Sequence, residues 1–135
     1  MASIHKDVLI DAPAADVWES VRDVGAIHTR LAQGFVLDTR LEDDSRLVTF
    51  AGGTVVRERI ITVDDQARRL AYSVVEGRFT HHSASIQVVP DGPSTSRVVW
   101  IADLLPDDIA GFVDGMMTQG CAAMKRTLEG ARVGG

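Results

Sequence analysis

The sequence has few aromatic residues, one cysteine and no run of basic residues. Aromatic side chains make up 5% of its 135 residues, and Cys121 is the single cysteine. One cysteine excludes an intrachain disulfide, and the four histidines show no metal-ligand spacing. The net charge of −5 without a basic run argues against a nucleic-acid partner. We therefore expect no metal, no other cofactor and no nucleic acid.

Long apolar runs are also missing. No segment approaches the ~18–20 apolar residues that a membrane span needs, and Ser3 to Asp11 alternates between polar and apolar residues instead of forming the core of a signal peptide. We expect a cytoplasmic protein without a membrane span. There is no G-x-S-x-G motif, and Gly52-Gly53 lacks the Lys-Ser/Thr of a phosphate loop, so we interpret it as a hairpin turn.

The remaining composition is that of a globular domain. Apolar residues make up 45% of the chain and charged residues 24%, which suits one domain over residues 1–135. Alternating segments at roughly ten-residue spacing, separated by tight turns, predict an antiparallel meander. We expect strands over 3–11, 34–43, 46–52, 54–64, 69–78, 81–90 and 95–104, helices over 13–23 and 25–31, and a long helix over 106–130.

The long helix carries the clearest periodicity. Its apolar residues recur every three or four positions and predict one stripe that faces the sheet: Ile109, Phe112, Val113, Met116, Met117, Cys121, Met124 and Leu128. Three glycines interrupt this helix, at 111, 115 and 120. Two interpretations stay open: the glycines allow close packing, or they leave room for a ligand.

Strand alternation sorts the other side chains into two faces. Arg57 and Arg59 mark one face of segment 54–64 as solvent-exposed, which turns Glu58 inward. Applied to each strand, this reasoning gives an apolar inner face with a few polar groups, the composition of a ligand pocket. The predicted pocket residues are Val56, Glu58, Ile60, Tyr72, Val74, Glu76, His82, Trp100, Met116, Met117 and Cys121.

Each of the more reactive candidates has a structural alternative. Glu58 either pairs with an arginine or acts as an acid, base or hydrogen-bond anchor in the pocket. Tyr72 and Trp100 are core aromatics or ligand contacts. We interpret Cys121 as an inert small hydrophobe. His81 and His82 fall on opposite faces of one strand and cannot easily bind the same metal ion.

Seven segments, in order, carry a resemblance to a known superfamily. The chain resembles polyketide cyclase/dehydrase-like proteins of the START/Bet v 1-like (SRPBCC) helix-grip superfamily. The segments are Ile10-Asp11-Ala12-Pro13, Val17-Trp18, residues 53–60 (GTVVRERI), Asp64-Asp65, residues 69–77 (RLAYSVVEG), residues 96–100 (SRVVW) and the terminal helix.

The resemblance implies an α+β helix-grip fold. A curved seven-stranded antiparallel sheet would wrap around the long C-terminal helix, with two short helices after the first strand and a ligand cavity between sheet and helix. In related proteins the positions matching Glu58, Tyr72 and Trp100 often face this cavity. Relatives often carry Trp-Pro where this chain has residues 27–32, so the entrance is expected to differ, with His28 near it.

Three functions follow from these observations. The leading hypothesis is a protein that binds a small hydrophobic or aromatic molecule, such as a polyketide-, lipid- or isoprenoid-like compound. The second is a polyketide cyclase or dehydratase that uses Glu58 as general acid/base. The third is a protein-interaction adaptor that uses the sheet or an open groove, and a filled interior with a large exposed apolar patch would favour it. The sequence leaves open the ligand, the pathway, the roles of His28 and of the His81-His82 pair, and the oligomeric state, a homodimer included.

Overall fold

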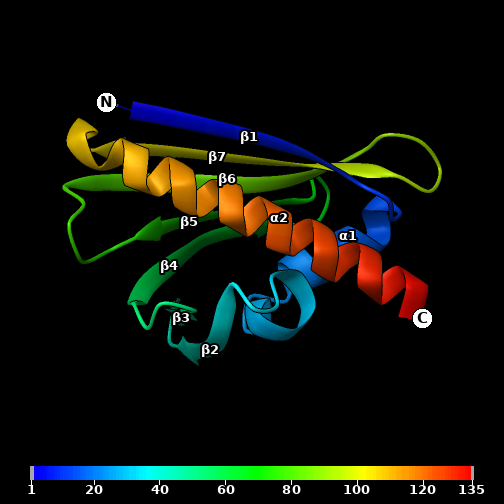
Figure 1. Cartoon of the computed structure of the whole chain (residues 1–135), viewed down its shortest axis with the longest axis horizontal. Helices are drawn as coiled ribbons and strands as arrows, with labels where there is room; N and C mark the ends of the chain where they lie inside the picture. The colour runs from blue at the N-terminus through cyan, green and yellow to red at the C-terminus, as the bar shows by residue number, and fades with distance from the viewer. Residues whose placement is uncertain (1, 135) are drawn as a thin grey trace.

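A seven-stranded antiparallel sheet wraps around one long helix in the computed structural model, which describes residues 2–134 (Figure 1). The strands are β1 (Ala2–Ile10), β2 (Val36–Glu42), β3 (Ser45–Phe50), β4 (Val55–Asp64), β5 (Arg69–Val74), β6 (His81–Pro90) and β7 (Ser96–Leu105). The helical segments are α1 (Ala14–Arg22), the single π-turn η1 (Ile27–Leu31), the 3₁₀ turn η2 (Asp107–Ile109) and α2 (Ala110–Gly134).

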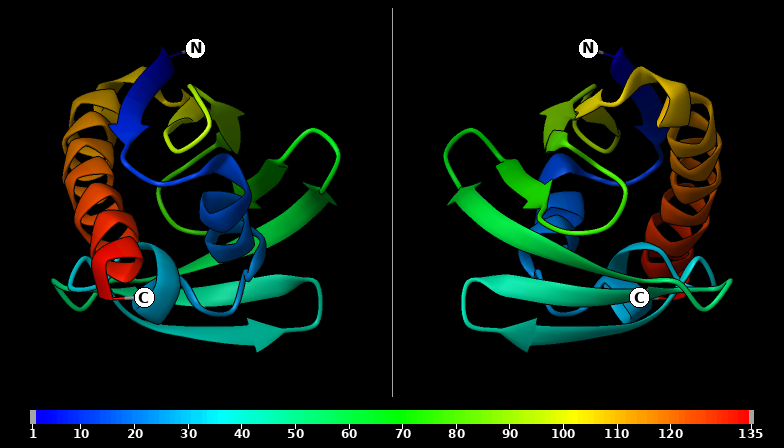
Figure 2. Two further views of the ribbon diagram at one scale, coloured as in Figure 1. Left: turned by 90° about the vertical axis from the view of Figure 1, so that its right-hand side faces the viewer. Right: turned by 90° about the vertical axis from the view of Figure 1, so that its left-hand side faces the viewer.

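The strand order is β1-β7-β6-β5-β4-β3-β2. All neighbours except β1 and β7 are consecutive in sequence, so the predicted meander is confirmed. The sheet curls strongly, and α2 runs along its concave side while α1 and η1 lie at one end (Figure 2). The side chains on the concave face and on α2 therefore meet in the interior. This arrangement confirms the expected α+β helix-grip architecture.

Strand alternation correctly identifies the inner face over most of the sheet. In β7, Val98, Ala102 and Leu104 are almost completely buried, and β6 buries every second residue from His82 to Val88. Arg57 and Arg59 of β4 lie on the convex face, where they form ion pairs with Glu42, Glu76 and Asp44. Burial of the alternate apolar residues drives the folding of each strand onto α2.

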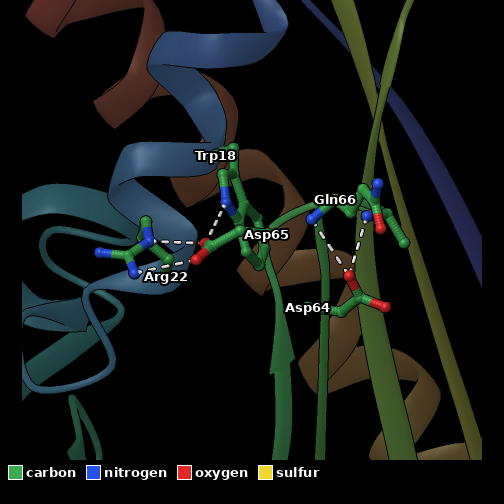
Figure 3. Close-up of polar contacts among 6 residues, drawn as sticks. Trp18, Arg22, Asp64, Asp65 and Gln66 are labelled. Atoms are coloured by element: carbon green, nitrogen blue, oxygen red, sulfur yellow. Dashed lines mark hydrogen bonds and ion pairs between the residues drawn. The ribbon is translucent and has the colours of Figure 1, made fainter.

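Trp18 fixes α1 to the sheet. It is 4% exposed, as expected for a core residue, and its Nε1 donates a hydrogen bond of 2.9 Å to Oδ1 of Asp65 in the β4–β5 turn (Figure 3). Arg22, one helical turn further along α1, donates to the same carboxylate. Asp64 closes the turn by accepting hydrogen bonds from the backbone N–H groups of Gln66 and Ala67. One face of α1 is thereby held against the sheet.

Two strands depart from the predicted pattern. A bulge between Ile60 and Thr62 inserts an extra residue into β4, so the alternation that holds up to Ile60 changes there and Thr62 is exposed. Segment 69–78 was expected to be one strand, but β5 ends at Val74, where the Val74 N–H donates to Nδ1 of His82. The Val75 N–H still donates to the Arg57 carbonyl of β4, but Glu76 is exposed and no longer follows the alternation of the strand.

The predicted stripe of α2 is buried over most of its length. Met117, Cys121, Met124 and Leu128 are at most 9% exposed, and Met116 is half-buried. Phe112 departs from the prediction, since it is 65% exposed in the first turn of the helix. Among residues 2–134, no helix is both long and apolar enough to cross a membrane.

Candidate ligand-binding cavity

A cavity of about 450 Å³ lies between the concave face of the sheet and α2. This volume falls within the range of ~300–1,000 Å³ typical of small-molecule sites. Its wall is mainly apolar. The residues that line it are Ile27, Leu31, Ala32, Phe35, Val36, Arg46, Val48, Phe50, Gly52, Thr54, Val56, Glu58, Tyr72, Val74, Phe79, His82, Ile86, Trp100, Ala102, Phe112, Val113, Met116, Met117, Gln119, Gly120 and Met124.

Aromatic side chains are concentrated at this cavity. All four phenylalanines of the chain line it, together with Tyr72 and Trp100. Phe35 and Phe50 meet edge to face with ring centroids 5.3 Å apart. Phe112 is exposed at the start of α2, and the Arg78 guanidinium lies 5.6 Å from the centre of its ring. A protein with only 5% aromatic residues thus places most of them around one interior space.

The most polar part of the wall is a buried ion pair. Nε of Arg46 donates to Oε1 of Glu58 at 2.8 Å, and the two side chains are 3% and 9% exposed. Arg46 also donates to the carbonyl of Val24, and its guanidinium lies 5.2 Å from the centre of the Tyr72 ring. Such a pair is stable in an apolar interior only if its hydrogen bonds are made. Glu58 therefore faces inward as expected, and its partner is a buried arginine.

Tyr72 and Trp100 form a second polar contact. Trp100 Nε1 donates to the Tyr72 hydroxyl oxygen at 2.9 Å, across strands β5 and β7. Burial raises the pKa of Tyr72 well above its usual range, and the nearby Glu58 carboxylate adds to the effect. The phenol is therefore neutral at physiological pH.

The Trp100 indole also touches α2. A Cβ atom at Gly120 would lie 2.9 Å from Cζ3 of Trp100 and 3.2 Å from Cε2 of Phe35. No such contact exists at Gly111 or Gly115. Of the two interpretations of the helix glycines, close packing therefore applies at Gly120.

His82 is the third polar group of the wall. Its Nδ1 accepts a hydrogen bond of 3.0 Å from the Val74 N–H, and its ring lies edge to face against Phe79 at 4.8 Å. Burial lowers the pKa of His82 to about 4, and the neighbouring His81 contributes in the same direction. The imidazole is therefore neutral at physiological pH.

Eight of the eleven residues predicted for the pocket lie in this cavity wall. They are Val56, Glu58, Tyr72, Val74, His82, Trp100, Met116 and Met117. Whether they contact a ligand stays a prediction. The other three, Ile60, Glu76 and Cys121, lie outside the wall, each for a separate reason.

Ile60 packs against the core where the bulge of β4 begins. Glu76 follows the end of β5, is exposed, and accepts a hydrogen bond from Arg57 Nε at 3.0 Å. Cys121 is buried but sits one residue, or about 100° of helical rotation, beyond Gly120. Asp114 and Lys125, which lie on the same side of α2, contact Lys6 and the Leu9 carbonyl of β1, so Cys121 lies toward that edge of the sheet.

His28 and His81 do not belong to the wall. Nδ1 of His28 lies 3.1 Å from the Thr39 hydroxyl, and the neighbouring Ile27 lines the cavity. The place of His28 near the entrance stays a prediction. His81 is exposed on the opposite face of β6 from His82, as alternation predicted. Within residues 2–134 no three His, Cys, Asp or Glu side chains are grouped as a metal site would require.

Arg46 is the important residue that the sequence interpretation missed. It faces Glu58 directly in the register between β3 and β4. A hairpin centred on Gly52 would have predicted this pairing, because positions 46 and 58 are equally distant from that turn. Opposite charges at facing positions of an antiparallel pair are a recognisable signal. Three of the phenylalanines, Phe35, Phe50 and Phe79, were missed because each lies in a loop or at the end of a strand, where alternation gives no face. Phe112 was placed on the stripe of the long helix but not in the pocket.

Comparison with protein families agrees with this architecture. Residues 1–130 match the model of the family described as "Polyketide cyclase / dehydrase and lipid transport". The chain belongs to this family. No curated protein matches the chain significantly.

Solved structures of other proteins share this fold. The solution structure of a protein from Thermobifida fusca is 30% identical, covers 99% of this chain and 94% of its own, and has a TM-score of 0.77. The di-domain ARO/CYC BexL from the BE-7585A biosynthetic pathway is 21% identical with a TM-score of 0.81, and the match spans 96% of this chain and 47% of BexL. A START superfamily protein from Mycobacterium smegmatis is 16% identical over 96% of this chain and 95% of its own, with a TM-score of 0.70.

Proposed function

We propose that this protein binds one small hydrophobic or aromatic molecule, of polyketide-, lipid- or isoprenoid-like character, between its sheet and α2. The observation that carries the proposal is the 450 Å³ cavity with a mainly apolar wall. A space of this size inside a packed protein lacks the dispersion contacts that would otherwise stabilise the fold. Occupation by an apolar ligand restores them.

The character of the wall supports an aromatic ligand in particular. Six aromatic side chains line the cavity, and edge-to-face contacts of the kind seen between Phe35 and Phe50 are also available to a ligand ring. Met116, Met117 and Met124 form the helix side of the wall, and flexible thioether side chains adapt to irregular ligand shapes. The polar groups are few and buried, which is typical of sites that orient one ligand.

Two substitutions on β4 test the proposal. Val56→Trp places an indole into the cavity, whereas Val55→Trp places the same side chain on the exposed convex face. We expect wild type and Val55→Trp to bind the neutral fluorophore 1-aminoanthracene and Val56→Trp to lose at least tenfold in affinity. Native mass spectrometry of protein purified from its own host, followed by extraction, would identify the bound molecule. Equal binding by both variants would contradict the proposal.

A cyclase or dehydratase that uses Glu58 as general acid/base is the second candidate. It is favoured by the position of Glu58 in the cavity wall, close to the Tyr72 phenol. The Arg46 hydrogen bond to Oε1 weighs against it, because it engages the carboxylate that would have to reach a substrate proton. If the protein is an enzyme, it should convert the extracted molecule, and Glu58→Gln should reduce kcat by about 10²–10⁴-fold. If it is a carrier, the extracted molecule should remain unchanged in the presence of either protein.

An adaptor is the least supported of the three functions. That hypothesis expected a filled interior, and the interior contains a cavity.

A further inference from the structure

We propose that the cavity selects ligands that carry a carbonyl-type oxygen, which accepts hydrogen bonds from Nε2–H of His82 and from the hydroxyl of Tyr72. The inference rests on the proposed binding function and adds a substrate class to it: uncharged aromatic or polyketide-like molecules with a ketone or quinone oxygen. Three observations lead to it.

The first observation fixes the tautomer of His82. The backbone N–H of Val74 can only donate, so Nδ1 of His82 must be the acceptor in their 3.0 Å hydrogen bond. A neutral imidazole carries one proton, which is then on Nε2. The pKa of about 4 keeps the ring in this neutral form. His82 therefore has one N–H donor in a known position.

The second observation concerns the partners that are open to this donor. Among residues 2–134, no protein group accepts a hydrogen bond from Nε2 of His82. In the same range, every side-chain nitrogen or oxygen that is fully shielded has a partner, so Nε2 keeps some accessible surface. His82 is 9% exposed and lines the cavity. The cavity is thus where a ligand atom can meet this N–H.

The third observation is a second donor on the adjacent strand. The Tyr72 oxygen already accepts from Trp100 Nε1, and no acceptor for the Tyr72 O–H is found within residues 2–134. The Tyr72 and His82 rings lie 6.0 Å apart, centre to centre, on the same face of β5 and β6. Both groups offer a proton and both are neutral. A ligand that also offered only donors would leave these buried groups unpaired.

The pairing of Arg46 with Glu58 further restricts the class of ligand to uncharged molecules. Arg46 is the one cation in the cavity wall, and its Nε already bonds a carboxylate, so the wall holds no cation that is free of a carboxylate partner. An anionic ligand would therefore enter a wall without a counter-charge, which is costly in an apolar interior. A neutral carbonyl oxygen requires donors only.

A pair of three-ring probes tests the inference. 9-Fluorenone and fluorene have the same shape and differ by the carbonyl oxygen. We expect wild type to bind fluorenone about tenfold more tightly than fluorene, as one or two neutral hydrogen bonds allow. Fluorene-9-carboxylate should bind more weakly than either. Quenching of tryptophan fluorescence provides the affinities, since Trp100 lines the cavity.

A matched pair of histidine variants isolates the donor. His82→Asn keeps an acceptor near the position of Nδ1 for Val74 but removes the Nε2 donor, and the fluorenone preference should fall below threefold. His81→Asn makes the same change on the exposed face of β6 and should keep the preference. If His82→Asn does not fold, the infrared band of the fluorenone carbonyl bound to wild type tests the inference instead. A hydrogen-bonded carbonyl should absorb at lower wavenumber than fluorenone in hexane, where no donor is present.

The outcomes separate the two proposals. Equal affinity for fluorenone and fluorene, or an unshifted carbonyl band, overturns the inference while ligand binding itself stands. Retention of the tenfold preference in His82→Asn also overturns it. Failure of wild type to bind either probe contradicts the proposed binding function, and the inference falls with it.

Discussion

Arg46 and Glu58 form an ion pair that faces an apolar cavity instead of solvent. Their 2.8 Å contact joins β3 to β4 at facing positions of the ladder. A buried pair of this kind contributes little compared with a well-packed apolar pair, but the removal of one partner leaves an unpaired charge in the interior. This asymmetry gives the first prediction.

Arg46→Met and Glu58→Leu should each lower the free energy of unfolding by about 3–5 kcal/mol. The double variant should lose less than either single variant, because no buried charge then remains. Urea unfolding at neutral pH measures all three values. Arg59→Met is the control, because its ion pair with Asp44 lies on the surface, and it should stay within about 1 kcal/mol of wild type. Additive losses in the double variant would contradict this account.

Cys121 should be unreactive in the folded protein. The residue is buried, and burial raises the pKa of its thiol, with a smaller opposing effect of the Lys6 ammonium. Since the thiolate is the reactive form, labelling by a disulfide reagent at neutral pH should be at least tenfold slower than in urea-unfolded protein. Labelling at equal rates in both states would show that this part of α2 opens easily.

The sequence predicted the inner face of the sheet because alternation has a fixed period of two. Trp100 of β7 was assigned on this basis alone and lines the cavity, and Val98, Ala102 and Leu104 on the same face of the strand are buried. The assignment failed for Glu76 because β5 ends two residues earlier. Strand ends and bulges depend on tertiary hydrogen bonds, such as the one between Val74 and His82, which no local pattern records.

The existence of the cavity was less well determined by the sequence than the identity of the residues that face the interior. Alternation and helix periodicity show which residues face the interior, and eight of the eleven predicted residues do line the wall. They do not show whether the interior is filled, because that depends on how closely α2 approaches the sheet. The close contact between Gly120 and Trp100 is one determinant of this approach. It could not be identified from the sequence, in which three helix glycines looked equivalent.

Protonation of His82 should destabilise the fold at mildly acidic pH. Burial lowers the pKa of His82 to about 4 in the folded state, against about 6.5 in the unfolded chain. Between these values the unfolded chain binds more protons, so stability is fully present above pH 6.5 and is lost as the pH falls toward 4. The loss is of the order of 3 kcal/mol, since one pKa unit corresponds to about 1.4 kcal/mol.

Urea unfolding of wild type and His82→Asn across this pH range measures the effect. The slope of stability against pH should be smaller in the variant. His5→Asn, which removes an exposed histidine from β1, is the matched control. If the slope persists in His82→Asn and disappears in His5→Asn, the acid sensitivity arises from His5, and the prediction for His82 is wrong.

Gly120→Ala should reduce both stability and ligand affinity, although alanine favours helices. The added methyl would lie 2.9 Å from Trp100 Cζ3, and the indole can relieve this contact only by moving into the cavity or away from Tyr72. We expect a loss of about 1–3 kcal/mol in unfolding free energy and at least tenfold weaker binding of 1-aminoanthracene. Gly115→Ala, with no neighbour within 4 Å of the new atom, should instead gain up to about 1 kcal/mol and bind normally. Equal effects of the two substitutions, by urea unfolding and fluorescence titration, would show that the Gly120–Trp100 contact does not set the depth of the cavity.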